Sequence, residues 1–244
     1  MKNKKLLSGL LAVSMLTSGF SAFAAYGTGT FAEETRTYFY SNTYDKDLEN
    51  NFGYDMEITA DPDSSAVDNK VMHVTDTDGT GKGTSNLYST LQLGFNWKSQ
   101  ENMGIDGSKK TVSSVDMYLP SGLLNELSEK KIRAGVLPLT YWDIYVTGMT
   151  ITKTDGEDTF TLTVGDSVKK IQPDTWFNLK CDYRIKKAPV NVYINDELLG
   201  TAQVPDWQRT DETGYWNVQS YFGGIGFKSD ANMPLTTGFY IDNA

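Results

Sequence analysis

The stretch 176–200, WFNLKCDYRIKKAPVNVYINDELLG, restricts the fold more than any other part of this chain of 244 residues. Apolar and polar residues alternate from Phe177 to Tyr183, and the alternation returns at 190–194 after a basic segment. Side chains of a strand point alternately to the two faces of a sheet, so this pattern predicts a half-buried antiparallel hairpin. We expect the turn of this hairpin at 186–189, and a second tight turn at Asn195-Asp196.

Short segments rich in Val, Ile, Thr, Tyr and Phe follow one another along the chain, with Gly, Asp, Asn and Pro between them. The predicted strands are 37–41, 70–75, 87–95, 111–119, 132–137, 141–152, 159–164, 176–183, 190–194, 200–204, 221–228 and 238–242. Many short strands at this spacing predict an all-β fold, a two-sheet antiparallel β-sandwich. The segment 121–131 has helical spacing, and Ser121 suits a helix cap. We expect scarcely any other helix.

The N-terminus has the features of a secretory signal peptide. Three lysines precede an apolar run at 6–16, and 22–24 (AFA) offers the small residues that a signal peptidase reads. The run is too short for a membrane span, which takes about 20 apolar residues. We expect a signal peptide at 1–24, a flexible leader at 25–35 and one domain at 36–244. The protein is then secreted, with no membrane contact after cleavage.

Charge and cysteine content narrow the choice of partners and chemistry. The formal net charge is −9, and it falls to −12 when the signal peptide takes away three lysines and no acid. Such a chain repels nucleic acid and anionic lipid at long range, so we expect neither as a partner. Cys181 is the only cysteine, which excludes an intramolecular disulfide. Its place on the apolar side of the hairpin predicts a buried side chain rather than a nucleophile.

The hairpin and three further stretches resemble a known family. The pattern W-x-x-L-x-x-x-Y, a basic turn and V-x-V-Y-I-N-x-x-L-x-G is similar to the central hairpin of concanavalin A-like jelly rolls of the laminin-G type. The stretch 69–75 (NKVMHVT) resembles an early strand of these domains, and 223–228 (GGIGFK) and 238–243 (GFYIDN) resemble their last two strands. The resemblance covers most of 36–244. It implies two facing antiparallel sheets, often a bound calcium, and often a sugar on the concave sheet.

The end of the chain departs from this family. Members usually continue for a few alternating apolar residues beyond the position of Asn243, whereas this chain ends at Ala244. We therefore expect the last strand to be truncated. We expect either a truncated reading or a fragment of a longer, secreted bacterial protein, of which this domain is a monomeric module.

Carboxylates that could cleave a glycosidic bond are hard to find in the sequence. Sugar-cleaving enzymes need two carboxyl groups about 5–10 Å apart, which appear on one strand as acids two or four residues apart. No Glu-x-Asp occurs in the chain, and Glu157-Asp158 belongs to a TDGEDT segment typical of a solvated turn. We expect no catalytic residues.

The resemblance also implies a second enzymatic alternative, because the family contains polysaccharide lyases. These use a Tyr or His base beside an Arg and a Gln or Asn. His73 is the only histidine, and its neighbours Met72 and Val74 favour a structural role. Arg133 together with the tyrosines of 141–145 leaves a lyase open. A lyase, before a glycoside hydrolase, is therefore the alternative function.

Aromatic residues interleaved with polar ones indicate a sugar-binding surface, because flat rings stack on the apolar face of a pyranose while amides and acids bond its hydroxyls. Two segments have this composition, 141–145 (YWDIY) and 205–222 (PDWQRTDETGYWNVQSYF). The predicted ligand-binding residues are Tyr141, Asp143, Tyr145, Trp207, Arg209, Tyr215 and Trp216. The prediction is a non-catalytic carbohydrate-binding module for a polysaccharide or oligosaccharide. A structural or adhesive cell-surface domain is a further alternative.

One structural calcium ion is a further hypothesis. Asp76 and Asp78 stand two residues apart before a glycine turn, and oxygen ligands at that spacing suit calcium. An EF-hand loop would need a Glu at the position of Leu87, so that motif is excluded. The resemblance adds Asp242 as a metal ligand, because related jelly rolls often bind calcium through an acid near the last strand.

Overall fold

The computed structural model describes residues 51–52, 54–63, 65–66, 68–77, 79, 90–93, 110–138, 146–184, 187–203, 222–230 and 233–244. All of them belong to one compact unit, Phe39–Ala244. In this part of the chain, no helix combines the length and the apolar character that a membrane span requires.

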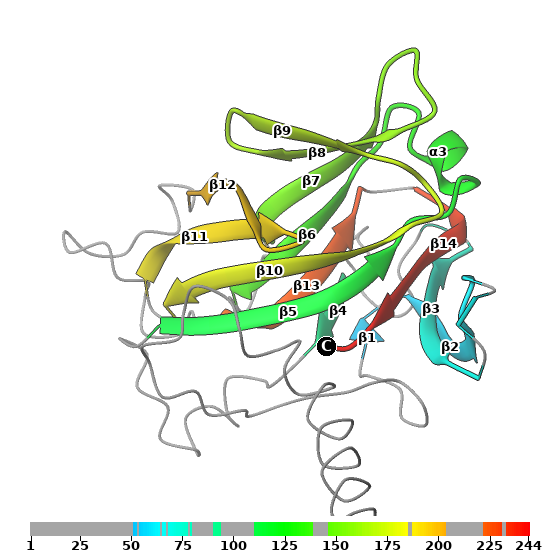
Figure 1. Ribbon diagram of the computed structural model, residues 1–244, viewed down its shortest axis with the longest axis horizontal. Coiled ribbons are helices and arrows are strands. Elements are labelled where there is room, and N and C mark those ends of the chain that lie inside the picture. Colours follow the sequence, from blue (N-terminus) through cyan, green and yellow to red (C-terminus); the bar gives the residue numbers. More distant parts are fainter. Residues whose placement is uncertain are drawn as a thin grey trace, which may run out of the picture. The chain divides into compact units, whose positions relative to one another are not determined.

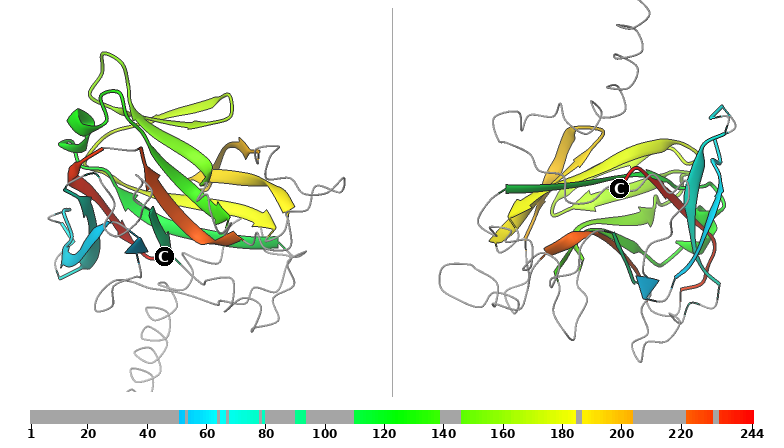
Figure 2. Two further views of the ribbon diagram at one scale, coloured as in Figure 1. Left: turned by 180° about the vertical axis from the view of Figure 1, so that it is seen from behind. Right: turned by 90° about the horizontal axis from the view of Figure 1, so that it is seen from below.

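The described strands form two antiparallel sheets of seven strands each (Figures 1 and 2). Sheet A contains, in spatial order, β1 (Asn51–Phe52), β4 (Thr90–Leu93), β13 (Phe222–Ser229), β6 (Ile132–Pro138), β7 (Thr147–Lys153), β8 (Phe160–Val164) and β9 (Ser167–Ile171). Sheet B contains β12 (Glu197–Ala202), β11 (Lys187–Ile194), β10 (Trp176–Arg184), β5 (Lys110–Tyr118), β14 (Leu235–Asp242), β3 (Lys70–Asp76) and β2 (Asp55–Ala60). The predicted two-sheet antiparallel sandwich is confirmed.

The hydrophobic core lies between the two sheets, because each central strand buries alternate side chains toward the other sheet. Sheet A contributes the fully buried Phe160 and Phe227, and sheet B contributes Met72, Met117 and Phe239. The rings of Phe227 and Phe239 lie 5.2 Å apart between their centroids and join the sheets. The side chains at the intervening positions point away from the core, which gives each sheet an outward face.

The predicted hairpin forms, with a correction to its turn. Phe177, Leu179, Cys181 and Tyr183 are all buried, as the alternation predicted, and burial raises the pKa of the Cys181 thiol well above its usual range. A thiol in this state is a packing group rather than a nucleophile. The turn predicted at 186–189 is wrong, because Arg184 already pairs with Lys187. The register shifts between Asp182 and Arg184, and a proline is tolerated in a strand at such an irregularity.

The other predicted local structures hold in part. Asn195 and Asp196 both have positive φ, 51° and 67°, which is the geometry of a tight type I′ turn. The helix α3 (Leu123–Glu126) is shorter than predicted, and the Ser121 cap is wrong, because the capping position is Gly122 and no side chain caps it. The strands β1, β2 and β9 were not predicted.

Candidate functional site

The predicted sugar-binding residues and one predicted metal ligand lie outside the described residues. They are Tyr141, Asp143, Tyr145, Trp207, Arg209, Tyr215, Trp216 and Asp78. The described strands do show where the segments that carry the sugar-binding residues attach to the sandwich.

Three of the four ends of the two aromatic segments attach to neighbouring strands of sheet A, whereas the second segment begins after β12 of sheet B. The first leaves the end of β6 at Pro138 and returns at the start of β7, where Thr147 pairs with Val136. The second enters the start of β13 at Phe222, which pairs with Pro138 itself. Because β6 is antiparallel to both β7 and β13, these three attachment points share one end of sheet A (Figure 1).

A strip without side chains lies beside these attachment points on the outward face of sheet A. Gly226, Gly135 and Gly148 are consecutive partners across β13, β6 and β7. A Cβ atom at Gly148 would lie 2.3 Å from the carbonyl oxygen of Ala134, and one at Gly135 would lie 2.4 Å from that of Thr147. Real Cβ atoms do not approach so closely, so the close pairing of β6 with β7 requires glycine at both positions. Gly135 and Gly226 are themselves buried, and Gly148 is half-buried.

Arg133 occupies the next outward position on β6. Its Nη1 donates to Asp230 Oδ1 at 2.9 Å, and both side chains are about a quarter exposed. Asp230 Oδ2 also accepts the backbone N–H of Lys131 at 3.1 Å, which ties the start of β6 to the end of β13. Arg133 therefore lies on the same face as the glycine strip, at the start of β6, whereas the segment 139–145 follows the end of that strand.

His73 lies on the other sheet, on the outward face of sheet B. Its ring stacks on Tyr240 with centroids 4.3 Å apart, Nε2 lies 2.8 Å from the carbonyl oxygen of Thr237, and Nδ1 lies 3.2 Å from Glu57 Oε1. The core separates His73 from Arg133, so these two residues do not form one lyase site. The structural role predicted for His73 agrees with these contacts.

A row of aromatic side chains that the sequence did not reveal crosses sheet B. Trp176 pairs with Tyr118, Tyr118 with Tyr240, and Tyr240 with His73, so four adjacent strands contribute one ring each. Burial raises the pKa of both Tyr118 and Tyr240, with nearby carboxylates adding to the effect. Because His73 and Tyr240 turn their ring faces toward one another, this row stabilises the sheet through cross-strand pairs. The sequence feature that could have predicted this row is the aromatic residue at an outward position of each of these strands.

Two of the predicted metal ligands, Asp76 and Asp242, lie at opposite ends of the paired strands β3 and β14. Asp76 is opposite Leu235 at the start of β14, whereas Ile241 is opposite Met72 and Asp242 follows it. Five residues of β3 therefore separate them, which corresponds to about 16 Å. They cannot bind one ion together. Asp76 Oδ1 instead accepts the backbone N–H of Gly79 at 3.0 Å and shapes the turn after β3.

Asp242 belongs to a different polar group, at the end of β14. The side-chain amide of Asn69 contacts Asp242 Oδ2 at 3.3 Å and Asp61 Oδ2 at 2.9 Å. Asp61 Oδ1 accepts from the indole nitrogen of Trp176 at 3.0 Å, which joins the group to the aromatic row. No cluster of three or more His, Cys, Asp or Glu side chains suited to a metal occurs in the part of the chain that the structure describes.

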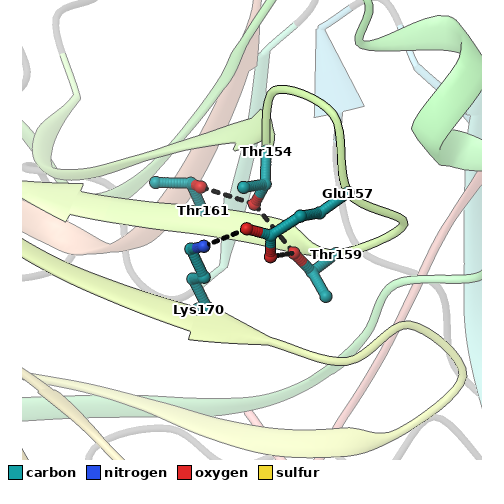
Figure 3. A network of polar contacts seen from close by, with 5 residues as sticks. All are labelled: Thr154, Glu157, Thr159, Thr161 and Lys170. Carbon is teal, nitrogen blue, oxygen red and sulfur yellow. Dashed lines mark hydrogen bonds and ion pairs between the residues drawn. The ribbon is translucent and has the colours of Figure 1, made fainter.

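Glu157 has the turn role that the sequence indicated (Figure 3). Its carboxylate accepts from Lys170 Nζ at 2.5 Å on β9 and from the Thr159 hydroxyl at 3.4 Å. Thr159 in turn donates to Thr154, whose hydroxyl lies 2.7 Å from that of Thr161. The hydrogen bond from Lys170 lowers the pKa of Glu157, so the group stays ionised and holds the β7–β8 turn. A general acid would need the opposite shift.

Comparison with known proteins finds similarity of structure but not of sequence. No known protein family matches the chain, and no curated protein does. A sialidase aligns over 77% of this chain and 16% of its own length, with 11% identity and a TM-score of 0.40. An alginate lyase of polysaccharide lyase family 7 aligns over 80% and 81%, with 15% identity and a TM-score of 0.34. A carbohydrate-binding module from Bacillus subtilis aligns over 80% and 94%, with 11% identity and a TM-score of 0.28. All three TM-scores are below 0.5, so no functional conclusion rests on them.

Proposed function

We propose that this β-sandwich is a secreted, non-catalytic carbohydrate-binding module of the concanavalin A-like type. In this proposal a polysaccharide lies along the outward face of sheet A, beside the segments that contain Tyr141, Asp143, Tyr145, Trp207, Arg209, Tyr215 and Trp216. The supporting observation is that both segments attach at the same end of β6, β7 and β13. Pro138 and Phe222, which are far apart in the sequence, pair at this end.

The composition of sheet A favours binding over hydrolysis. A glycosidase needs two carboxyl groups across the scissile bond, and the described strands of sheet A contain no Asp or Glu. The alternative is a polysaccharide lyase. Arg133 favours it, because this basic residue lies on the outward face of β6, the strand that leads into the tyrosine-bearing segment 139–145.

A depletion assay with product analysis tests the proposal. The chain is incubated with a panel of plant and microbial polysaccharides, and both the bound protein and the released sugars are measured. The proposal predicts capture by at least one polysaccharide without release of soluble or unsaturated products. Release of products would identify an enzyme, and the absence of both capture and products would identify a structural or adhesive domain.

We also propose one structural calcium ion, placed at Asp242 rather than at Asp76. Carboxylate oxygens of Asp61 and Asp242 both face the Asn69 amide, and rotation of that amide would add a third oxygen to them. Calcium takes about six to eight oxygen ligands, and these three would supply part of that set. A ligand that binds only the folded state stabilises it by about 2.7 kcal/mol at a hundredfold excess over Kd. We expect a higher Tm in millimolar calcium than in excess chelator, and no such rise for Asp242→Asn. Equal Tm values of the parent chain in both buffers would contradict the proposed calcium ion.

A further inference from the structure

The outward face of sheet A carries a regular group of threonines on β7 and β8. Thr150 pairs with Thr163, and Thr152 pairs with Thr161, with no register shift between the two pairs. On each strand the residue between the two threonines is fully buried, so all four side chains point away from the core. These four residues are called the threonine platform below.

The threonine platform is regular and stiff. Side chains opposite one another on paired strands lie about 5 Å apart, and side chains two residues apart on one strand lie about 7 Å apart. Threonine is branched at Cβ, which restricts its side chain to few rotamers. The platform therefore presents hydroxyls at fixed positions, at a spacing comparable to the length of one pyranose unit, and a ligand has little side-chain freedom to remove.

Three of the four hydroxyls are available to a ligand. Thr161 Oγ1 lies 2.7 Å from Thr154 Oγ1 and is engaged there (Figure 3). The side chains of Thr150, Thr152 and Thr163 make no hydrogen bond in the part of the chain that the structure describes, and all three are only half-buried. A hydroxyl both donates and accepts hydrogen bonds. It therefore matches a sugar hydroxyl, which does the same, better than a carboxylate or sulfate, which only accepts.

The positive charges on the same face already have partners. Arg133 Nη1 donates to Asp230, and Lys170 Nζ donates to Glu157. Lys228 takes part in an interaction as well. The chain has a net charge of −9, so an anionic polymer is repelled at long range, and these contacts offset the cations that could attract it locally. A neutral polymer meets no such barrier.

The position of the threonine platform suits a sugar chain that crosses the strands. Thr150 lies about 10 Å along β7 from Thr147, the start of the strand, to which the segment 139–145 attaches. In the other direction the row continues from Thr163 to Val168 on β9, whose apolar side chain is 60% exposed. A chain lying across β7, β8 and β9 would thus contact hydroxyls and then an apolar edge, the two kinds of surface that a neutral pyranose itself presents.

We infer that the polysaccharide on the outward face of sheet A is neutral, and that Thr150, Thr152 and Thr163 select it through hydrogen bonds to its hydroxyls. This inference rests on the proposed carbohydrate-binding function and specifies the class of ligand. The selection follows because the platform offers groups that both donate and accept, whereas burial of an anion carries a desolvation cost that hydroxyls alone do not offset.

The test uses pairs of soluble polymers that share a backbone and differ in charge. Hydroxyethyl cellulose is paired with carboxymethyl cellulose, and dextran with dextran sulfate, alongside the neutral and anionic members of the depletion panel. Affinity electrophoresis and calorimetry in about 0.15 M salt measure each Kd. We expect at least one neutral polymer to bind, and anionic polymers to bind at least about ten-fold more weakly.

Substitution by valine removes the hydroxyls and keeps the shape of the threonine platform. Thr150→Val with Thr163→Val should weaken binding of the neutral polymer roughly ten-fold, because two ordinary hydrogen bonds are lost. Serine at the same two positions keeps the hydroxyls and should restore most of the affinity. The control Thr59→Val with Thr236→Val makes the same chemical change on sheet B and should bind as the parent does. Both valine variants should keep the parent Tm, since valine favours strands as threonine does.

The outcomes distinguish this inference from the function on which it rests. Parent-like binding by Thr150→Val with Thr163→Val overturns the inference, as does an equal loss in the sheet B control. An equal loss in the valine and serine variants would assign the effect to packing and overturns it too. Preference for an anionic polymer overturns the inference and leaves the proposed function standing. Failure to bind any polymer, neutral or anionic, overturns both.

Discussion

Gly238→Ala should destabilise the protein by about 2–5 kcal/mol. Gly238 lies in β14 at the register shift between Leu235 and Phe239, with φ at +66°. A Cβ atom there would lie 2.0 Å from the carbonyl oxygen of Val74 on β3. Left-handed backbone costs an L-residue about 1–2 kcal/mol, and overpacking adds about 1–3 kcal/mol. Denaturant unfolding of both proteins measures the difference.

Gly156→Ala is the matched control for this prediction. Gly156 has nearly the same backbone angle, φ +70°, but a Cβ atom added to it would meet nothing within 4 Å. The backbone cost remains, whereas the clash with a neighbouring strand is absent, so we expect a loss of about 1 kcal/mol. Equal losses at the two positions would show that the approach of β14 to β3 is not as close as described.

Trp207→Ala should weaken polysaccharide binding by roughly thirty-fold and leave the fold intact. Aromatic side chains at recognition surfaces cost about 2 kcal/mol or more when truncated. Trp207 follows a proline and an aspartate in a polar stretch, which is why we predicted an exposed, ligand-stacking ring there. Calorimetry with a polysaccharide captured in the depletion panel measures the loss.

Thermal melting of the same variant separates this role from a structural one. Truncation of a core tryptophan costs about 3–5 kcal/mol of stability. A Tm of the Trp207→Ala protein far below that of the parent would show that the ring packs in the core and does not belong to the sugar site. Parent-like melting with parent-like binding would leave Trp207 at the surface without a role in recognition.

The central strands could be predicted because each of them buries one face. Burial of one face produces an alternation of apolar and polar residues in the sequence. Alternation at 176–183 and 190–194 reappears as the buried faces of β10 and β11. The strands β2 and β9 lie at the edges of their sheets. The sequence of β9, SVKKI, is largely polar because an edge strand is partly solvated and is often protected by charge, so it shows no clear alternation. The sequence of β2, DMEITA, does alternate, and this strand could have been predicted from it.

The pairing register of the strands decides which residues meet at the candidate site, and local sequence patterns contain no information about that register. Nothing in the sequence near Gly135 shows that Gly148 and Gly226 lie on either side of it, or that Arg133 is opposite Lys228. For the same reason Asp76 and Asp242 were grouped as metal ligands although the pairing of β3 with β14 places them far apart. Composition did identify the two aromatic segments, and the sheet order then brought their attachment points together.

Steric blocking of each outward face tests most directly whether sugar binds to sheet A. Thr150→Trp places a large side chain on the outward face of sheet A beside Arg133, and Thr201→Trp places one on sheet B beside Asn191. The measurement is the Kd of both folded variants for one polysaccharide that the parent captures. We predict that Thr150→Trp abolishes binding and that Thr201→Trp keeps the parent Kd. Parent-like binding by Thr150→Trp together with loss in Thr201→Trp would contradict the account and move the site to sheet B.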